Sequence, residues 1–276
     1  MNSTQELGND VSITFKTDSG AGLFSNFNRI ITILHESSEV KRVKWDIYGQ
    51  NSGCMGYDSS GELFSSVFQD FDESNKLPLI EYISYNWGAY KPGRITGMEV
   101  IDYYMNRDKL LPFNKIFKKY FKLKPDIQSI MDNEIKKIRG SSDILFGLVV
   151  RSTGSSSPLK DEQPKGRMPT RGEYEDVIDN IPGDKYNRYF LCIDNEEDLN
   201  FYKSKLPNSY HTNIRRSKGC NDLEPHKNTR GTWNDFLDSL LEVYYLASCD
   251  VIIHCVTNMA TTSLYMNMNQ ISIPII

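Results

Sequence analysis

The sequence has few of the features that mark membrane proteins, secreted disulfide scaffolds or zinc folds. Its five cysteines are an odd number without a CxxC pair, whereas disulfide and zinc scaffolds use paired or closely spaced cysteines. No apolar run approaches the ~20 residues that a membrane helix needs, and residues 1–12 have neither a basic start nor an apolar stretch. We therefore expect a cytoplasmic protein with reduced core thiols and no membrane anchor.

An excess of basic charge is also missing. Lysine and arginine number 32 against 36 aspartates and glutamates, which gives a net charge of −4. Binding to nucleic acid or anionic lipid by bulk charge needs a basic field, so no nucleic-acid partner is expected and an anionic ligand has to be held locally. The lysine-rich segment 115–124 has its apolar residues at helical spacing, which favours an amphipathic helix over an RNA-binding surface.

Several catalytic motifs are absent. The sequence has no Gly-x-Ser-x-Gly elbow, Walker loop, HExxH pair or Gly-x-Gly-x-x-Gly turn opening a helix. The four histidines lack metal-ligand spacing, and His254 lies in an apolar run, which favours a hydrogen-bonded core residue. The triplet Asp70-Phe-Asp72 matches a metal-binding DxD pattern, but it falls in a helix predicted over 62–71, so we expect no metal site.

Apolar segments alternate with helical patterns along the 276 residues. Runs typical of strands occupy 11–15, 43–48, 79–85, 144–150, 188–193 and 251–255. Helical spacing follows Ser25, a predicted N-cap, and recurs over 107–139 with a break at Lys124-Pro125, and over 171–180, 196–205, 234–247 and after Asn258. This alternation predicts an α/β protein with doubly wound parallel sheets. At roughly 150 residues per domain we expect two domains, 1–140 and 141–276.

Polar residues follow three of the predicted strands in the second half. Arg151 follows the strand at 144–150, Asp194 follows 188–193, and Thr257 with Asn258 follows 251–255. Ligands of open α/β sheets bind beyond the carboxyl ends of the strands, where helix N-termini favour anions. A guanidinium can hold a phosphate by two hydrogen bonds and a carboxylate can accept from a sugar hydroxyl. Together these residues predict a nucleotide-diphosphate site.

Three segments in this order resemble the motifs of α1,2-, α1,6- and protein-O-fucosyltransferases. They are FGLVVRSTG (146–154), YFLCIDNEEDL (189–199) and LLEVYYLASCDVIIHCVTNMA (240–260). The segment TDSGAGLFSNFN (17–28) is similar to the glycine- and asparagine-containing loop with which these enzymes begin. The family patterns read approximately HVRxTD, xxATD and LSxCDxxIxxxSN. The resemblance covers about residues 144–265.

The resemblance implies a GT-B architecture, in which two Rossmann-like doubly wound domains face a cleft. The C-terminal domain would hold a nucleotide-sugar donor and the N-terminal domain would shape the glycan acceptor side. Arg151 would hold the pyrophosphate and act in catalysis, Asp194 would support the donor pocket, and Thr257 with Asn258 would meet the β-phosphate. Gly22 and Asn26 of the opening loop would also contact the donor. The implied reaction is an inverting, metal-independent transfer of a sugar to a hydroxyl, without a cofactor. A cytoplasmic member of this family without an anchor would suit a glycan pathway of a bacterium or of a virus-infected host cell.

The sequence departs from the family at several positions. The motif histidine is replaced by Val149 or Val150, the second arginine by Ser152 and the motif aspartate by Gly154. The resemblance favours a GDP-sugar with fucose as the donor. The departures leave two alternatives open, namely another donor such as UDP-xylose and a non-catalytic sugar- or nucleotide-binding protein. Arg215 and Arg216 lie where they could supply the missing cation or form a solvated basic turn.

The catalytic base is expected to be a carboxylate across the cleft. Asp18 precedes the glycine loop and is the first candidate, with Asp58 and Asp72 as rivals.

Overall fold

The structure is a computed structural model that describes most of the second half of the chain and parts of the first. The described residues are 11–16, 23–36, 40–48, 63–72, 79–83, 104–142, 144–151, 163, 165–182, 187–214, 216–218 and 233–275. Within these ranges no helix has the length and the apolar character needed to cross a bilayer.

The N-terminal half contains a four-stranded sheet of order β3-β2-β1-β4. The central strand β1 runs parallel to β2 and β4, and β3 pairs antiparallel with β2. Its elements are β1 (Val11–Lys16), α1 (Leu23–Glu36), β2 (Val40–Tyr48), α2 (Leu63–Val67), β3 (Phe71–Asp72) and β4 (Leu79–Ile83).

The C-terminal half contains a five-stranded, fully parallel sheet of order β7-β6-β5-β8-β9. Its strands are β5 (Leu145–Val150), β6 (Arg188–Ile193), β7 (Ser209–Tyr210), β8 (Val251–His254) and β9 (Ile271–Pro274). The helices that accompany them are α6 (Arg171–Asp179), α7 (Glu196–Lys205), α9 (Trp233–Ala247) and α10 (Asn258–Met266). This confirms the predicted mixed α/β fold with a parallel sheet.

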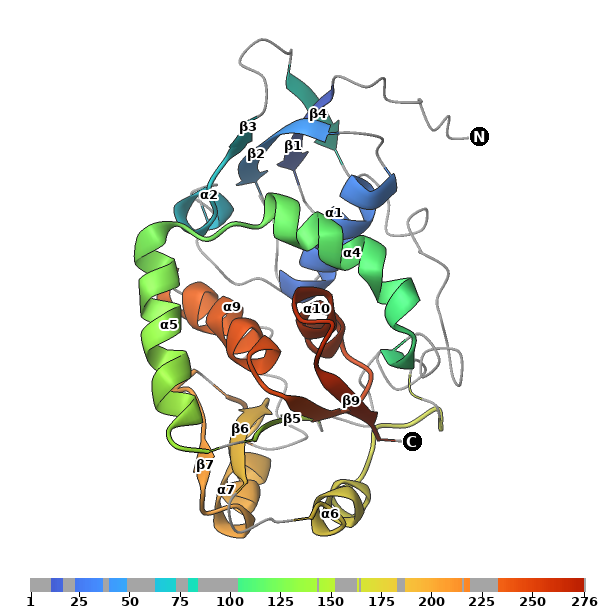
Figure 1. Cartoon of the computed structure of the whole chain (residues 1–276), viewed down its shortest axis with the longest axis vertical. Coiled ribbons are helices and arrows are strands. Elements are labelled where there is room, and N and C mark those ends of the chain that lie inside the picture. Colours follow the sequence, from blue (N-terminus) through green and yellow to red (C-terminus); the bar gives the residue numbers. More distant parts are fainter. Residues whose placement is uncertain are drawn as a thin grey trace.

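Both faces of the second sheet are buried. Along β5, Leu145 and Val149 join the core beneath α9 and α10, whereas Phe146, Leu148 and Val150 join the core beneath α6 and α7. Figure 1 shows these two pairs of helices on opposite sides of the sheet. Because successive side chains of a strand point to opposite faces, a strand covered on both sides must be apolar at every position. The run of apolar residues in β5 is continuous because helices cover both faces of the strand.

Two helices connect the sheets. They are α4 (Arg107–Tyr120) and α5 (Pro125–Arg139), which confirms the predicted break. Asn106 caps α4 through its side chain, and Pro125 occupies the first turn of α5, where its missing N–H removes no helical bond. Lys115 and Lys118 are exposed while the opposite face of α4 is buried, as an amphipathic helix requires.

Helix α10 packs against both halves of the chain. Figure 1 shows it beside α4 and α1, between the two sheets. Asn114 of α4 donates to the carbonyls of Tyr265 (2.6 Å) and Met266 (3.1 Å) at the C-terminal end of α10. One hydrophobic core runs from Phe27 in α1 to Leu264 in α10. The first sheet ends with β4 and the second begins with β5, and helices of both halves share this core.

Some local predictions were wrong. Helix α1 begins at Leu23, so Ser25 lies inside it and is not its N-cap. The helix predicted over 62–71 ends at Val67, and Phe71–Asp72 pairs with β2 instead. Phe71 packs edge-on against Tyr120 of α4 at 4.7 Å between ring centroids, a tertiary contact that local spacing does not reveal.

Candidate active site

The three polar strand ends predicted from the sequence lie on one edge of the C-terminal sheet. Strand β5 lies between β6 and β8, and the register pairs Val150 with Ile193 and Val149 with His254. The residues that follow the three strands are therefore neighbours at the carboxyl edge. This is the edge where open parallel sheets bind ligands.

Arg151 and Asp194 form a loose ion pair at this edge. Arg151 Nε lies 3.7 Å from Asp194 Oδ2, and the side chains are 37% and 14% exposed. The Nε atom is buried and has no hydrogen-bond partner among the described residues. The guanidinium is thus next to a carboxylate without being fully engaged by it, so it can bind an anion.

Thr257 and Asn258 form the start of α10. Thr257 is buried and is the N-cap, and its hydroxyl accepts from the Ala260 N–H at 3.1 Å. Helical bonding begins with Thr261 N–H to the Thr257 carbonyl at 3.0 Å. The N–H groups of the first turn have no acceptor within a helix and bind anions readily.

Two residues that the sequence analysis did not assign to the site hold this turn in place. Asn28 of α1 donates to the Asn258 carbonyl (3.2 Å) and Oδ1 (3.3 Å), and its own Oδ1 accepts from Thr262 at 2.7 Å. Gln163 is buried and bonds both backbone groups of Val256, at 2.8 and 3.0 Å. The resemblance of residues 17–28 to a donor loop was the only sequence signal near Asn28, and Gln163 carried none.

Arg216 does not belong to the edge as a phosphate ligand, because its guanidinium points into the core. It donates from Nε to the Ile193 carbonyl (2.8 Å) and from Nη1 to the Thr212 and Ile214 carbonyls (2.8 and 3.0 Å). Nη2 donates to Thr212 Oγ1 (3.4 Å) and Glu242 Oε1 (3.3 Å). An arginine has five N–H donors, and all five have internal acceptors here. Neither predicted role, a replacement cation or a solvated turn, fits this environment.

Glu242, on α9, is the buried partner of Arg216. Both side chains are 2% exposed, and the Glu242 carboxylate also accepts from the Thr212 hydroxyl. Burial raises the pKa of Glu242 to about 7, against the opposing effects of the Thr212 hydrogen bond and the Arg216 charge. Arg216 joins Thr212 and Ile214 to the end of β6, where Ser217 N–H donates to the Asp194 carbonyl at 3.1 Å.

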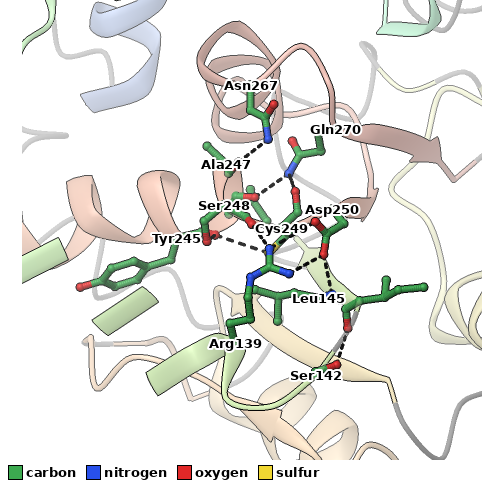
Figure 2. A network of polar contacts seen from close by, with 12 residues as sticks. Arg139, Ser142, Leu145, Tyr245, Ala247, Ser248, Cys249, Asp250, Asn267 and Gln270 are labelled. Atoms are coloured by element: carbon green, nitrogen blue, oxygen red, sulfur yellow. Dashed lines mark hydrogen bonds and ion pairs between the residues drawn. The ribbon is translucent and has the colours of Figure 1, made fainter. Parts of the chain in front are cut away.

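Asp250, which belongs to the third fucosyltransferase-like segment, lies at the opposite edge of the sheet. Figure 2 shows its carboxylate between Arg139 and the backbone of Leu145. Arg139 Nη1 and Nη2 donate to the two carboxylate oxygens at 2.9 and 3.2 Å, and Leu145 N–H donates to Oδ2 at 2.8 Å. Asp250 therefore joins the end of α5 to the start of β5 and has a structural role.

The substitution Asp250→Ala tests this role. We expect the free energy of unfolding to fall by about 1–2 kcal/mol, because a half-exposed ion pair and one backbone hydrogen bond are lost. Burial raises the pKa of Asp250, but the bonds from Arg139 and Leu145 outweigh it and leave that pKa below its usual value. The difference from wild type should therefore shrink as the pH falls through this pKa. Urea denaturation at pH 7 and pH 3 measures both effects, and a pH-independent difference would contradict the charge assignment.

Other candidate residues lie outside the described residues. These are Asp18, Gly22, Asp58, Arg215 and the side chains of Asn26 and Asp72. Within the described ranges no group of three or more His, Cys, Asp or Glu could hold a metal ion.

His254 is a hydrogen-bonded core residue, as predicted: it contacts the Ser272 hydroxyl at 2.8 Å, and burial lowers its pKa to about 4. Cys192, Cys249 and Cys255 are buried free thiols.

Comparisons with known proteins agree with this fold. Neither family models nor curated proteins gave a match to the sequence. Among solved structures, NodZ α1,6-fucosyltransferase co-crystallised with GDP matches at a TM-score of 0.52 and 12% identity, over 94% of this chain and 93% of that chain. The chain has a fucosyltransferase-like fold. The same enzyme soaked with GDP-fucose gives identical values, and NodZ from Bradyrhizobium matches at a TM-score of 0.49 and 14% identity, over 93% and 92% of the chains. The matches at a TM-score of 0.52 cover almost the whole length of this chain and of the NodZ chain.

Proposed function

We propose that this protein is a nucleotide-sugar glycosyltransferase that moves fucose from GDP-fucose to a hydroxyl of a glycan acceptor. The observation that carries the proposal is the carboxyl edge of the C-terminal sheet, where Arg151 lies beside Asp194 and α10 begins after the neighbouring strand β8. The fold similarity to NodZ structures determined with GDP and GDP-fucose supports it. The proposed architecture is GT-B, with the two sheets as the two Rossmann-like domains.

In the proposed reaction the acceptor hydroxyl attacks the anomeric carbon, the bond to the diphosphate breaks, and the sugar configuration inverts. Negative charge develops on the leaving diphosphate as the sugar becomes oxocarbenium-like. Arg151 would hold the pyrophosphate, and the first-turn N–H groups of α10 would meet the β-phosphate. Fixed donors placed where charge develops lower the barrier without reorganisation. The reaction would need no metal, and Asp18 remains the proposed base that takes the acceptor proton.

A non-catalytic sugar- or nucleotide-binding protein is the second candidate. The position of the family's motif histidine is occupied by Val149 or Val150, and both valines are buried in β5, at 3% and 4% exposure. No titratable group can act from that position. The arginine of the same motif is kept as Arg151, so donor binding could survive without transfer.

Calorimetry with GDP, UDP, GDP-fucose and UDP-xylose, followed by product analysis with candidate glycans, separates these proposals. GDP-fucose binding with transfer supports the fucosyltransferase, tighter UDP-xylose binding changes the donor, and binding without transfer or donor hydrolysis supports the non-catalytic protein. Absence of binding by all four ligands would refute the proposed donor site.

Metal independence has its own test. We expect transfer rates in excess EDTA to equal those in added Mg²⁺ or Mn²⁺, because Arg151 and the α10 N-terminus would supply the positive charge that a metal otherwise provides. A steep loss of transfer activity on chelation, restored by one of these ions, would favour a metal-bound donor. Asp70 and Asp72 would then be the candidate metal ligands.

A further inference from the structure

The residue after Asp194 makes an unusual set of hydrogen bonds. Asn195 is fully buried and is the N-cap of α7, because its Oδ1 accepts from the Asp198 N–H at 2.8 Å. Its amide nitrogen donates to Asp198 Oδ2 at 2.7 Å and to Asp194 Oδ1 at 3.2 Å. Asn195 therefore caps a helix with one end of its amide and orients two carboxylates with the other.

The cap alone does not need an asparagine. Serine and aspartate are about as effective as N-caps, because each offers an oxygen to the first-turn N–H groups. Neither a serine hydroxyl nor a carboxylate can keep that oxygen on the helix and also donate to two acceptors. Capping therefore accounts for the amide oxygen of Asn195 but not for its amide nitrogen. The nitrogen donates to two carboxylates, one of which is Asp194.

Asp198, which accepts from the Asn195 amide, is itself held in place by Arg171. Asp198 is buried, and its Oδ1 accepts from Arg171 Nε at 2.5 Å. A buried carboxylate is stable only when paired, and Arg171 at the start of α6 provides the charge. A continuous series of contacts then runs from Arg171 through Asp198 and Asn195 to Asp194, whose Oδ2 lies 3.7 Å from Arg151 Nε.

We propose that Asn195 is a positioning residue for the donor site: its amide nitrogen holds one oxygen of Asp194, so that the other faces Arg151. The inference rests on the proposed function, since it assigns Asn195 an effect on nucleotide-sugar binding that passes through Asp194. With the carboxylate held in this way, Asp194 Oδ2 stays 3.7 Å from Arg151 Nε, and the guanidinium would be left to bind an incoming diphosphate. Without the amide, the carboxylate can turn and pair with Arg151 more completely, in competition with the donor.

The test is a double-mutant cycle on GDP-fucose binding, measured by calorimetry. Asn195→Ser keeps the cap and removes the amide nitrogen, and we expect about tenfold weaker binding, the scale of one hydrogen bond to a charged group. In an Asp194→Asn background the same change should alter binding less than twofold, because coupled residues are non-additive. The matched control is Asn106→Ser, an asparagine N-cap on α4, which should leave binding unchanged in both backgrounds.

The outcomes separate the two proposals. If wild type binds neither GDP nor GDP-fucose, the proposed function fails. If wild type binds and Asn195→Ser binds equally well, or loses the same factor in both backgrounds, the positioning role is wrong. Asn195→Thr, which also offers a hydroxyl oxygen for the cap and lacks the amide nitrogen, should likewise bind weakly and serves as the second variant if the serine variant is unstable. A crystal structure of either variant without nucleotide should have the Asp194 carboxylate rotated, and an unmoved carboxylate would overturn the inference independently of donor binding.

Discussion

Arg216→Met is expected to lower the free energy of unfolding by about 3–5 kcal/mol, because removing one partner of a buried ion pair leaves the other buried and uncompensated. Methionine fills much of the same volume but cannot donate to the carbonyls of Ile193, Thr212 and Ile214. Glu242 would then lose the only positive charge in contact with it among the described residues. Urea or thermal denaturation at pH 7 measures the loss.

Arg167→Met is the matched control. Arg167 also pairs with a glutamate, Glu173, but its side chain is 48% exposed. Exposed ion pairs contribute about 0.2–1 kcal/mol, so this variant should remain near wild-type stability. Equal effects of the two substitutions would mean that burial of the Arg216–Glu242 pair is not what stabilises the 212–217 segment.

The strands of the second half were predictable because their sequence is strongly constrained. A parallel strand covered on both faces must be apolar throughout, and the strand 188–193 was predicted with its observed bounds. The two-residue β7 and the four-residue edge strand β9 were not predicted, because short strands carry little pattern and Ile271 in β9 is 55% exposed. Helix α2 was predicted too long since Phe71 is held in a strand by its contact with Tyr120.

The places of the candidate residues after the strands could be predicted from the sequence, but the direction of an arginine side chain could not. Arg151 follows an apolar run, whereas Arg216 lies in the polar segment 207–219, where an exposed arginine would be expected. The first lies at the sheet edge and the second turns inward to Glu242, which is 26 residues away along the chain. That choice depends on a buried carboxylate from α9 and three backbone carbonyls, none of which has a local sequence signature. The same reason explains why Gln163 and Asn28 were missed, since their partners are 93 and 230 residues distant.

Substitution of Arg151 is expected to weaken ligand binding and to leave stability almost unchanged, in contrast to Arg216→Met. Arg151→Ala should weaken GDP and GDP-fucose binding by about 1.5–3 kcal/mol, or roughly 10- to 150-fold, because hydrogen bonds to a charged group are worth this much. The free energy of unfolding of Arg151→Ala should differ from that of wild type by less than about 1 kcal/mol, since the ion pair with Asp194 is long and partly exposed. Calorimetric titration combined with urea denaturation of the same sample distinguishes a binding defect from unfolding.

Arg139→Ala is a close control for this experiment. Arg139 is 34% exposed against 37% for Arg151, and it too pairs with an aspartate, Asp250, but at the opposite edge of the same sheet. We expect this variant to lose stability and to keep its affinity for GDP, whereas Arg151→Ala keeps stability and loses affinity. If Arg151→Ala binds GDP as wild type does, the diphosphate does not lie at the carboxyl edge of β5. If both variants lose affinity equally, the loss reflects a general disturbance of the sheet and Arg151 has no special role in donor binding.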